Sequence, residues 1–185
     1  VDDRAKVDDR GKIILGKGTY GTVYSEKGKA VKYFDKTCFL IQEGVAGRYL
    51  RDVPGILAIR EVDVHKIKTT SDLYDTNLER LMRKKKLTSG QRKAIVYDIL
   101  VALNEIHSRA LVHGDIKPLN ILVKDKGSEI GDKRYKIAIG DLGFVSLALY
   151  SKVDYTTSVY TGDNSCSPSH DVYSMGISML EIFAG

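Results

Sequence analysis

The sequence predicts an α+β fold in two lobes, in which an antiparallel sheet precedes a helical lobe. Short runs with β-like alternation fill the first half of the chain, and the two clearest helical patterns lie in the second half. Strands that come first and helices that follow are typical of segregated layers and not of alternating βαβ units. With 185 residues, the chain is long enough to bury a sizeable core.

The composition is that of an ordinary globular protein. Hydrophobic residues make up 43% and charged residues 29% of the chain, and the formal net charge is +5. That excess favours anionic ligands such as phosphates, but without a patterned basic stripe it does not indicate nucleic acid, and we expect no such partner. No apolar run is long enough to span a bilayer, so we expect no membrane partner. Cys38 and Cys166 form no C-x-x-C pair, which predicts a reducing, intracellular location, cytoplasmic or nuclear.

The sheet lobe is expected over residues 12–74. Residues 1–11 precede it as a polar segment, a short tandem repeat that cannot bury a face and should be solvated. Alternation predicts strands in this lobe, and the turn at 26–28 predicts a hairpin. In order, the expected elements are a glycine-rich strand pair over 12–25, a strand over 29–34, a weakly patterned helix over 38–50 and two strands within 56–70.

The helical lobe is expected over residues 75–185. A helix over 87–110 is its clearest element, with Thr88 or Ser89 as the N-cap. A strand over 121–123 follows, then a strand that ends in a turn within 135–143, and a last helix begins at residue 171. Apolar residues recur at helical spacing on one face of each helix. They are Ile95, Ile99, Ala102, Leu103 and Ile106 in the first helix, and Val172, Met175, Met179, Leu180 and Phe183 in the last.

Gly16, Gly18 and Gly21 form a G-x-G-x-x-G pattern. Glycines at these positions let backbone N–H groups approach phosphate oxygens closely. In a dinucleotide-binding unit the pattern would open a helix, but strand-and-turn sequence follows here, which favours a hairpin lid over a nucleotide. Taken alone, the fragment fits a plain glycine-rich hairpin equally well.

Lys32 lies on the next predicted strand. A lysine that binds phosphate needs an anionic partner to hold it in place, and Glu43 in the following helix is a candidate. Taken alone, a surface position for this lysine is the simpler interpretation.

The stretch HGDIKPLN, residues 113–120, places an aspartate, a lysine and an asparagine at offsets 0, 2 and 5. Asp115 can accept the proton of a hydroxyl nucleophile, Lys117 can neutralise charge on a transferred phosphoryl group, and Asn120 can bind Mg²⁺ through its amide oxygen. Asp141, which ends a later strand, can supply the second Mg²⁺ ligand. This spacing, between a well-patterned helix and an apolar strand, favours a phosphoryl-transfer site over a solvated loop.

With these residues, the chain resembles eukaryotic-type Ser/Thr protein kinases in a C-terminally truncated, minimal form. The resemblance implies a two-lobed protein-kinase-like fold, with an N-terminal antiparallel sheet lobe, a shortened helical C-lobe, and ATP and Mg²⁺ between them. It also implies the nucleotide contacts. Lys32, paired with Glu43, would hold the phosphates beneath the three glycines. Adenine would contact Val23, Ala30 and Leu122 and the backbone from Asp72 to Tyr74. Ser71 would be a small residue at the back of the pocket.

The resemblance assigns catalytic roles as well. Asp115 would be the catalytic base and Lys117 the partner of the γ-phosphate, and Asn120 and Asp141 would hold Mg²⁺. Thr157 falls where such kinases keep a threonine that bridges the catalytic aspartate and lysine. Asp171 would anchor the backbone of the catalytic loop.

The chain also departs from the family pattern. Gly114 stands where an arginine normally meets an activation-loop phosphate, so we expect no need for that phosphorylation. Gly47 replaces a bulky apolar residue on the Glu43 helix, and a gap there would weaken the coupling of that helix to the core. The family's Ala-Pro-Glu sequence and later helices are not found. The shortened lobe would expose apolar surface around Ile177, Leu180 and Phe183, which a second copy or another protein would cover.

The predicted function is transfer of the ATP γ-phosphoryl group to a Ser or Thr hydroxyl of a protein substrate. One alternative is an ATP-binding pseudokinase or decoy that binds and regulates other kinases. Another is a small-molecule phosphotransferase, which also lacks late helices but usually lacks the Lys-Pro pair after the catalytic aspartate.

Overall fold

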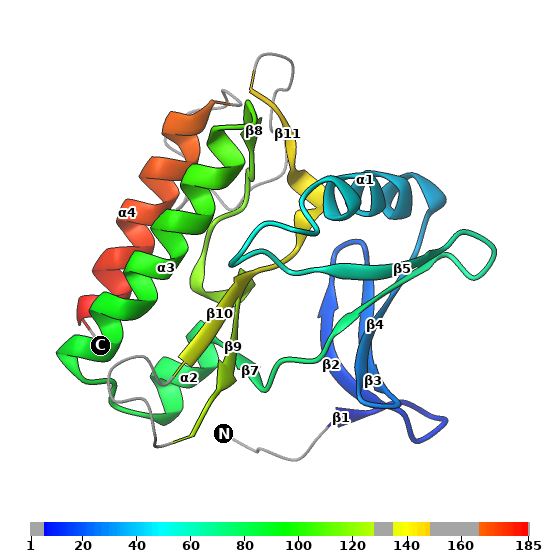
Figure 1. Cartoon of the computed structure of the whole chain (residues 1–185). Helices are drawn as coiled ribbons and strands as arrows, with labels where there is room; N and C mark the ends of the chain where they lie inside the picture. The colour runs from blue at the N-terminus through cyan, green and yellow to red at the C-terminus, as the bar shows by residue number, and fades with distance from the viewer. Residues whose placement is uncertain (1–5, 128–134, 149–166, 185) are drawn as a thin grey trace.

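The computed structural model of the chain describes residues 6–127, 135–148 and 167–184. Figure 1 shows a twisted sheet on one side of the molecule, two long helices on the other and a short pair of strands between them. The expected α+β class, with a sheet lobe before a helical lobe, is confirmed.

The sheet lobe contains a six-stranded antiparallel sheet with the strand order β1-β2-β3-β4-β6-β5. The predicted turn joins β3 to β4 through Lys27 and Gly28, both with positive φ, as a tight hairpin turn requires. The two strands expected within 56–70 are present as β5 and β6. The strands are β1 (Lys6–Val7), β2 (Ile13–Gly18), β3 (Gly21–Glu26), β4 (Lys29–Phe34), β5 (Ile59–Asp63) and β6 (Lys68–Asp72).

The polar segment 1–11 contributes to this sheet, which its sequence did not predict. Lys6 and Val7 form the edge strand β1 and pair with Ile14 and Ile13. Both residues of β1 are exposed, as a solvated segment should be. An edge strand needs only backbone donors and acceptors, which a polar sequence supplies as well as an apolar one.

Helix α1 (Thr37–Tyr49) packs closely against β5 through two glycines. A Cβ atom at Gly47 would lie 2.2 Å from Cγ1 of Ile59, and one at Gly44 would lie 3.3 Å from the Cγ atoms of Val62. The gap expected beside Gly47 is therefore absent, because a side chain of the opposing strand fills the space. The volume that the helix lacks is supplied by the sheet.

The helical lobe is built on three helices and two small antiparallel sheets. The order of the three-stranded sheet is β10-β9-β7, and β8 pairs with β11. Among the described residues, no helix is both long and apolar enough to cross a bilayer. The elements are β7 (Thr76–Asn77), α2 (Leu78–Lys84), α3 (Ser89–His107), β8 (Leu111–Val112), η1 (Pro118–Asn120), β9 (Ile121–Asp125), β10 (Tyr135–Ile139), η3 (Leu142–Phe144), β11 (Ser146–Leu147) and α4 (Pro168–Ala184).

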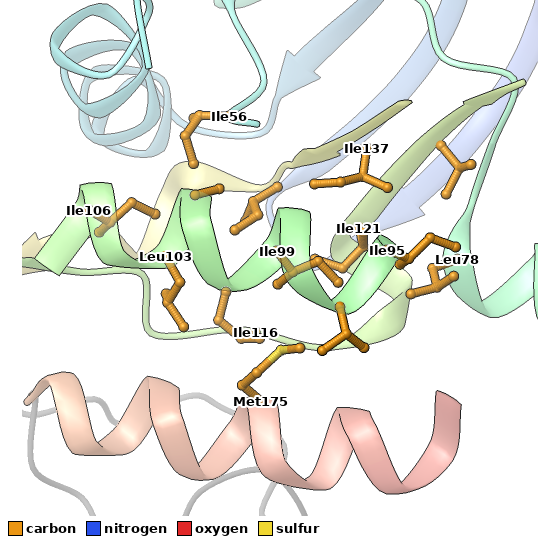
Figure 2. Close-up of a cluster of buried hydrophobic side chains, with 14 of the residues drawn as sticks. Ile56, Leu78, Ile95, Ile99, Leu103, Ile106, Ile116, Ile121, Ile137 and Met175 are labelled. Carbon is orange, nitrogen blue, oxygen red and sulfur yellow. The ribbon is translucent and has the colours of Figure 1, made fainter. Parts of the chain in front are cut away.

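Helix α3 forms the centre of the main core. It begins with a capping box, in which Thr88 accepts the N–H of Gln91 and Gln91 accepts the N–H of Thr88, so Thr88 is the N-cap. Its predicted apolar face is buried, as expected. Figure 2 shows that face packed against residues of β9, β10 and α4. Because those elements also border the loops after β8 and β10, the core fixes the position of both loops.

The expected apolar face of α4 is wrong in part. Met175 is buried and Met179 packs against the core, but Val172 and Leu180 are 60% and 67% exposed and Phe183 is exposed too. The helix instead buries a face that contains two serines, Ser174 and Ser178. Each serine hydroxyl donates to the carbonyl oxygen four residues earlier, so burial leaves neither group unsatisfied. The face of α4 that was predicted from hydrophobicity alone is therefore largely exposed.

A matched pair of glycine substitutions tests the packing of α1. Gly47→Ala should lower the free energy of unfolding by about 1–3 kcal/mol, because the new methyl group overlaps Ile59. Gly176→Ala on α4, where no atom lies within 4 Å of the added Cβ, should raise it by about 0.5–1 kcal/mol through helix propensity. Urea unfolding of both variants provides the measurement.

The source of the destabilisation is tested by a double-mutant cycle. Ile59→Ala costs stability by itself, but the double variant with Gly47→Ala should lose less than the sum of the two single losses, because Cγ1 of Ile59, the atom nearest to the added Cβ, is gone. Strictly additive losses would show that Gly47 does not contact Ile59.

Candidate active site

A cavity of about 300 Å³ lies where the two lobes meet, at the end of β6. Side chains and backbone from both lobes line it. The sequence predicted eleven of these residues as site residues, and they are Gly16, Gly18, Gly21, Val23, Ala30, Lys32, Glu43, Tyr74, Asn120, Leu122 and Asp141. Distant parts of the chain therefore converge on one cavity, as the motifs required.

The glycine motif forms a strand–turn–strand hairpin and opens no helix, as the sequence predicted, and its role as a lid over a nucleotide stays a prediction. Gly18 pairs with Gly21 at the tip. A Cβ atom at Gly21 would lie 2.1 Å from the carbonyl oxygen of Tyr33, so no larger residue fits there without movement of the backbone. The hairpin can therefore present its backbone N–H groups to the cavity at close range.

An aromatic residue at the hairpin tip was missed in the sequence. Tyr20 lines the cavity, and its ring centroid lies 4.3 Å from that of Phe39 on α1 and 5.5 Å from that of Phe144 on η3. These contacts hold the tip down toward the helical lobe. The signal available in the sequence was an aromatic residue inside the glycine motif, but its partners lie far along the chain.

Lys32 joins two carboxylates at the back of the cavity. Its Nζ donates to Glu43 Oε2 and to Asp141 Oδ1, the latter at 2.8 Å. Burial alone would lower the pKa of Lys32, but the two carboxylates outweigh it and hold the pKa above its usual value. The predicted pairing with Glu43 is therefore present, and the lysine is charged.

The two carboxylates differ in their environments. Burial raises the pKa of Glu43, which is 3% exposed, and Lys32 offsets this only in part. Burial also acts to raise the pKa of Asp141, but Lys32 outweighs it and the pKa is lowered. Asp141 therefore offers an ionised carboxylate at the cavity, and the Glu43 carboxylate is the buried partner of the lysine.

The loop between β8 and β9 holds the other polar residues of the site. Lys117 Nζ donates to the carboxylate of Asp115 at 2.8–2.9 Å. Asn120 Nδ2 donates to Asp115 Oδ2 and to the Asp115 carbonyl, both at 2.8 Å. Within the described residues, no hydrogen bond is made to the amide oxygen of Asn120. That oxygen is thus available as a ligand.

Asp171 on α4 fixes the backbone of this loop, as the resemblance implied. Its carboxylate accepts the N–H of His113 at 2.7 Å and that of Gly114 at 2.9 Å, and it also bonds His107 Nε2 at 2.9 Å. Burial alone would raise the pKa of Asp171, but these hydrogen bonds outweigh it and lower the pKa. The loop is therefore tied to α4 by a buried charge.

Gly114 has a conformational role that the sequence did not reveal. Its φ of +81° lies in the left-handed region, and a Cβ atom would lie 3.2 Å from the carbonyl oxygen of Phe144. Glycine therefore suits this position for its backbone as well as for its lack of a side chain.

Three residues of the predicted set need separate comment. The side chain of Asp72 does not line the cavity, because its carboxylate pairs with Lys29 and Arg60 on the surface. Its expected contact was through the backbone and stays a prediction. Ser71, expected at the back of the pocket, does line the cavity. Thr157 lies outside the described residues.

The donor set fits a magnesium nucleotide. The described residues contain no cluster of three or more His, Cys, Asp or Glu side chains that could hold a metal alone. Asp141 and Asn120 offer one carboxylate and one amide oxygen at the same cavity. Mg²⁺ is commonly held in this way, with one or two protein ligands, water and substrate phosphates.

Comparisons with known proteins agree with this arrangement. A family model described as the protein kinase domain matches residues 68–185. The chain is 27% identical to cell division control protein 2 homolog 2 of Trypanosoma brucei brucei over 91% of its length, and 28% identical to a probable CTD kinase subunit alpha homolog of Encephalitozoon cuniculi over 93%. It is 27% identical to cyclin-dependent kinase 2 of Caenorhabditis elegans over 91%. It covers 54%, 56% and 51% of these relatives, about half of each.

The anchoring role of Asp171 predicts a specific dependence of stability on pH. Asp171→Asn should lower the free energy of unfolding at pH 7 by about 3 kcal/mol, since one carboxylate accepts three hydrogen bonds. A carboxylate whose pKa is lowered by folding adds stability above its usual pKa of about 4, and this is lost as the pH falls through the folded-state value. The difference between wild type and variant should therefore shrink from pH 5 to pH 2.

Chemical denaturation at pH 7, 5, 3 and 2 provides the measurement. Asp52→Asn is the matched control, because the Asp52 side chain is 87% exposed and the substitution should change little at any pH. A loss in Asp171→Asn that stays constant over this range would rule out the buried charge as its origin.

Proposed function

The chain belongs to the protein kinase family, and we propose that it is a Ser/Thr protein kinase that transfers the γ-phosphoryl group of ATP to a protein hydroxyl. The observation that carries the proposal is that Lys32, Asn120 and Asp141 line one cavity and that Asp115 is hydrogen-bonded to Asn120. These are the residue types that phosphoryl transfer needs, because the reaction depends on positioning and on neutralising charge.

In this proposal the nucleotide lies beneath the glycine hairpin. Adenine contacts Val23 and Ala30 from the sheet and Leu122 from β9, all of which line the cavity. The backbone from Asp72 to Tyr74 binds the adenine edge. Lys32, positioned by Glu43, contacts the α- and β-phosphates.

Mg²⁺ neutralises phosphate charge when it is bound with ATP, and Asn120 and Asp141 would hold it. Asn120 fits this role because its amide nitrogen is engaged by Asp115 and its oxygen is not engaged within the described residues. Asp141 fits because its pKa is lowered, which keeps it ionised. Its left-handed backbone, with φ of +55°, turns the chain sharply after β10.

The remaining residues act on the acceptor hydroxyl. Asp115 orients the hydroxyl and accepts its proton as the oxygen bonds to the γ-phosphorus and the bond to the β-phosphate oxygen breaks. The products are ADP and a phosphorylated Ser or Thr. Lys117, which is hydrogen-bonded to Asp115, neutralises negative charge on the phosphoryl group during its transfer. Thr157 is proposed to bridge these two residues.

The proposal includes activity without activation-loop phosphorylation. Gly114 offers no side chain to meet a phosphate, and the loop on which it lies is already held by Asp171. The proposal also includes an intracellular location, cytoplasmic or nuclear. On the exposed side of α4, Leu180 and Phe183 support the idea that a second copy or another protein covers this helix.

The direct test is phosphoryl transfer from γ-labelled ATP to a generic basic protein with Mg²⁺ present and then chelated. Label should enter the protein only with Mg²⁺, and Asp115→Asn should lower kcat by about 10²–10⁴-fold while ATP binding persists. Fluorescence titration with ATP checks the binding. ATP binding by the wild type without any transfer would instead support the pseudokinase or decoy function, and transfer only to small metabolites would support the small-molecule phosphotransferase.

Independence from phosphorylation has its own test. Pretreatment with a broad phosphatase should leave kcat within about twofold, because Gly114 provides no cation for a phosphate to bind. Mass spectrometry before and after treatment confirms that phosphate was removed. A large loss of activity that returns on rephosphorylation would contradict this part of the proposal.

A further inference from the structure

A second cavity, of about 250 Å³, lies in the helical lobe and shares no lining residue with the active-site cavity. It is formed where the end of α2, the start of α3 and the end of α4 meet, as can be followed in Figure 1. We call it the basic pocket. Its lining residues are Met82, Arg83, Lys84, Lys85, Lys86, Arg92 and Ile182.

The basic pocket concentrates positive charge. Five of its seven lining residues are lysine or arginine, and none is aspartate or glutamate. A hollow lined by one sign of charge attracts ligands of the opposite sign.

Arg92 gives the pocket a fixed cation. The side chain is partly buried, and its Nε donates to the carbonyl oxygen of Leu87 at 3.2 Å while Nη1 donates to that of Ile182. Both of these contacts are to backbone carbonyl groups, and they orient the guanidinium. A guanidinium that is already oriented loses little freedom when an anion binds.

Two cations of the pocket, Arg83 and Lys85, have acidic neighbours that contact them weakly. Arg83 pairs with Glu79 one turn away at 2.8 Å, and Lys85 lies 3.6 Å from Asp125. Both are exposed pairs, which are worth about 0–1 kcal/mol and are easily exchanged for another anion. Among the described residues, Lys86 forms no ion pair.

Stabilisation of helix ends accounts for only part of this charge. Arg83 and Lys84 lie in the last turn of α2, where cations favour the helix dipole. Lys85 is the C-cap and Lys86 lies beyond the helix, so both exceed what that turn requires. These two additional lysines line the cavity.

We propose that the basic pocket binds an acidic segment of a protein substrate and holds that substrate while another part of it reaches the active site. This rests on the proposed function. Carboxylate or phosphate groups of the segment would contact the cations on the rim. Met82 and the buried Ile182 give the cavity an apolar floor on which an aliphatic side chain of the segment can pack.

A peptide fits this site better than a nucleic acid does. The lining contains no aromatic residue on which a base could stack, and the cations line a cavity and not a stripe that follows a backbone. A phosphate backbone also offers no apolar group that could pack against Met82 and Ile182.

Binding is tested on the full chain by fluorescence anisotropy with four labelled probes. These are a peptide with a run of glutamates, a peptide of neutral sequence with one phosphoserine, the first peptide with glutamine for glutamate, and a single-stranded DNA oligonucleotide. At least one acidic peptide should bind and weaken with added salt, and the glutamine peptide should not bind. The first two probes distinguish carboxylate from phosphate as the recognised group.

Two variants with equal charge change locate the site. Lys85→Ala/Lys86→Ala should weaken binding of the acidic peptide about tenfold or more, whereas Lys66→Ala/Lys136→Ala, at exposed positions outside the pocket, should change it less than twofold. Equal weakening by both variants would overturn the proposal in favour of non-specific charge attraction. Tighter binding of DNA than of either acidic peptide would also overturn it.

An activity measurement then tests the docking role. For an acceptor peptide with an acidic tail, Lys85→Ala/Lys86→Ala should raise KM with little change in kcat, and for the same peptide without the tail neither constant should change. A KM that is unaffected in both peptides would refute docking. If no phosphoryl transfer is detected at all, the proposed function fails, but the binding measurement still decides whether the pocket recognises acidic segments.

Discussion

The structure depends on one buried ammonium group. Lys32 on β4 contacts a carboxylate from α1 and another from the turn after β10, so it links the sheet, the helix and the helical lobe. Removing it would leave two carboxylates close together in a poorly solvated place, which is far more costly than the loss of an exposed ion pair. Asp141 and Asn120 line the same cavity, and their segments are joined by the N–H of Gly140, which donates to the Asn120 carbonyl at 2.8 Å.

The parts of the site that could be predicted are those whose geometry is local in sequence. Asp115, Lys117 and Asn120 lie within six residues, and the short η1 turn brings their side chains together. The hairpin was predictable for the same reason. The contacts of Tyr20 with Phe39 and Phe144 could not be predicted, because they join three segments whose proximity exists only in the folded chain.

Two errors share a physical cause, which is that a side chain was judged without its neighbour. Gly47 suggested a hole, yet Ile59 fills it from another strand. On α4, Val172 and Leu180 were expected on the buried face, yet Ser174 and Ser178 are buried instead, because their hydroxyls bond to carbonyl oxygens of their own helix. In both cases the residue is small. A small residue can mark a place where two elements pack closely, and it need not be exposed. Such positions are therefore where hydrophobic periodicity is least informative.

The aromatic contacts of Tyr20 have a consequence for turnover. If the nucleotide lies beneath the hairpin, as proposed, lifting of the tip during its release separates Tyr20 from rings that belong to α1 and η3. The barrier to departure of the spent nucleotide thus includes the loss of that contact in addition to the loss of phosphate contacts. In an enzyme built in this way, the step that follows chemistry can be the slow one.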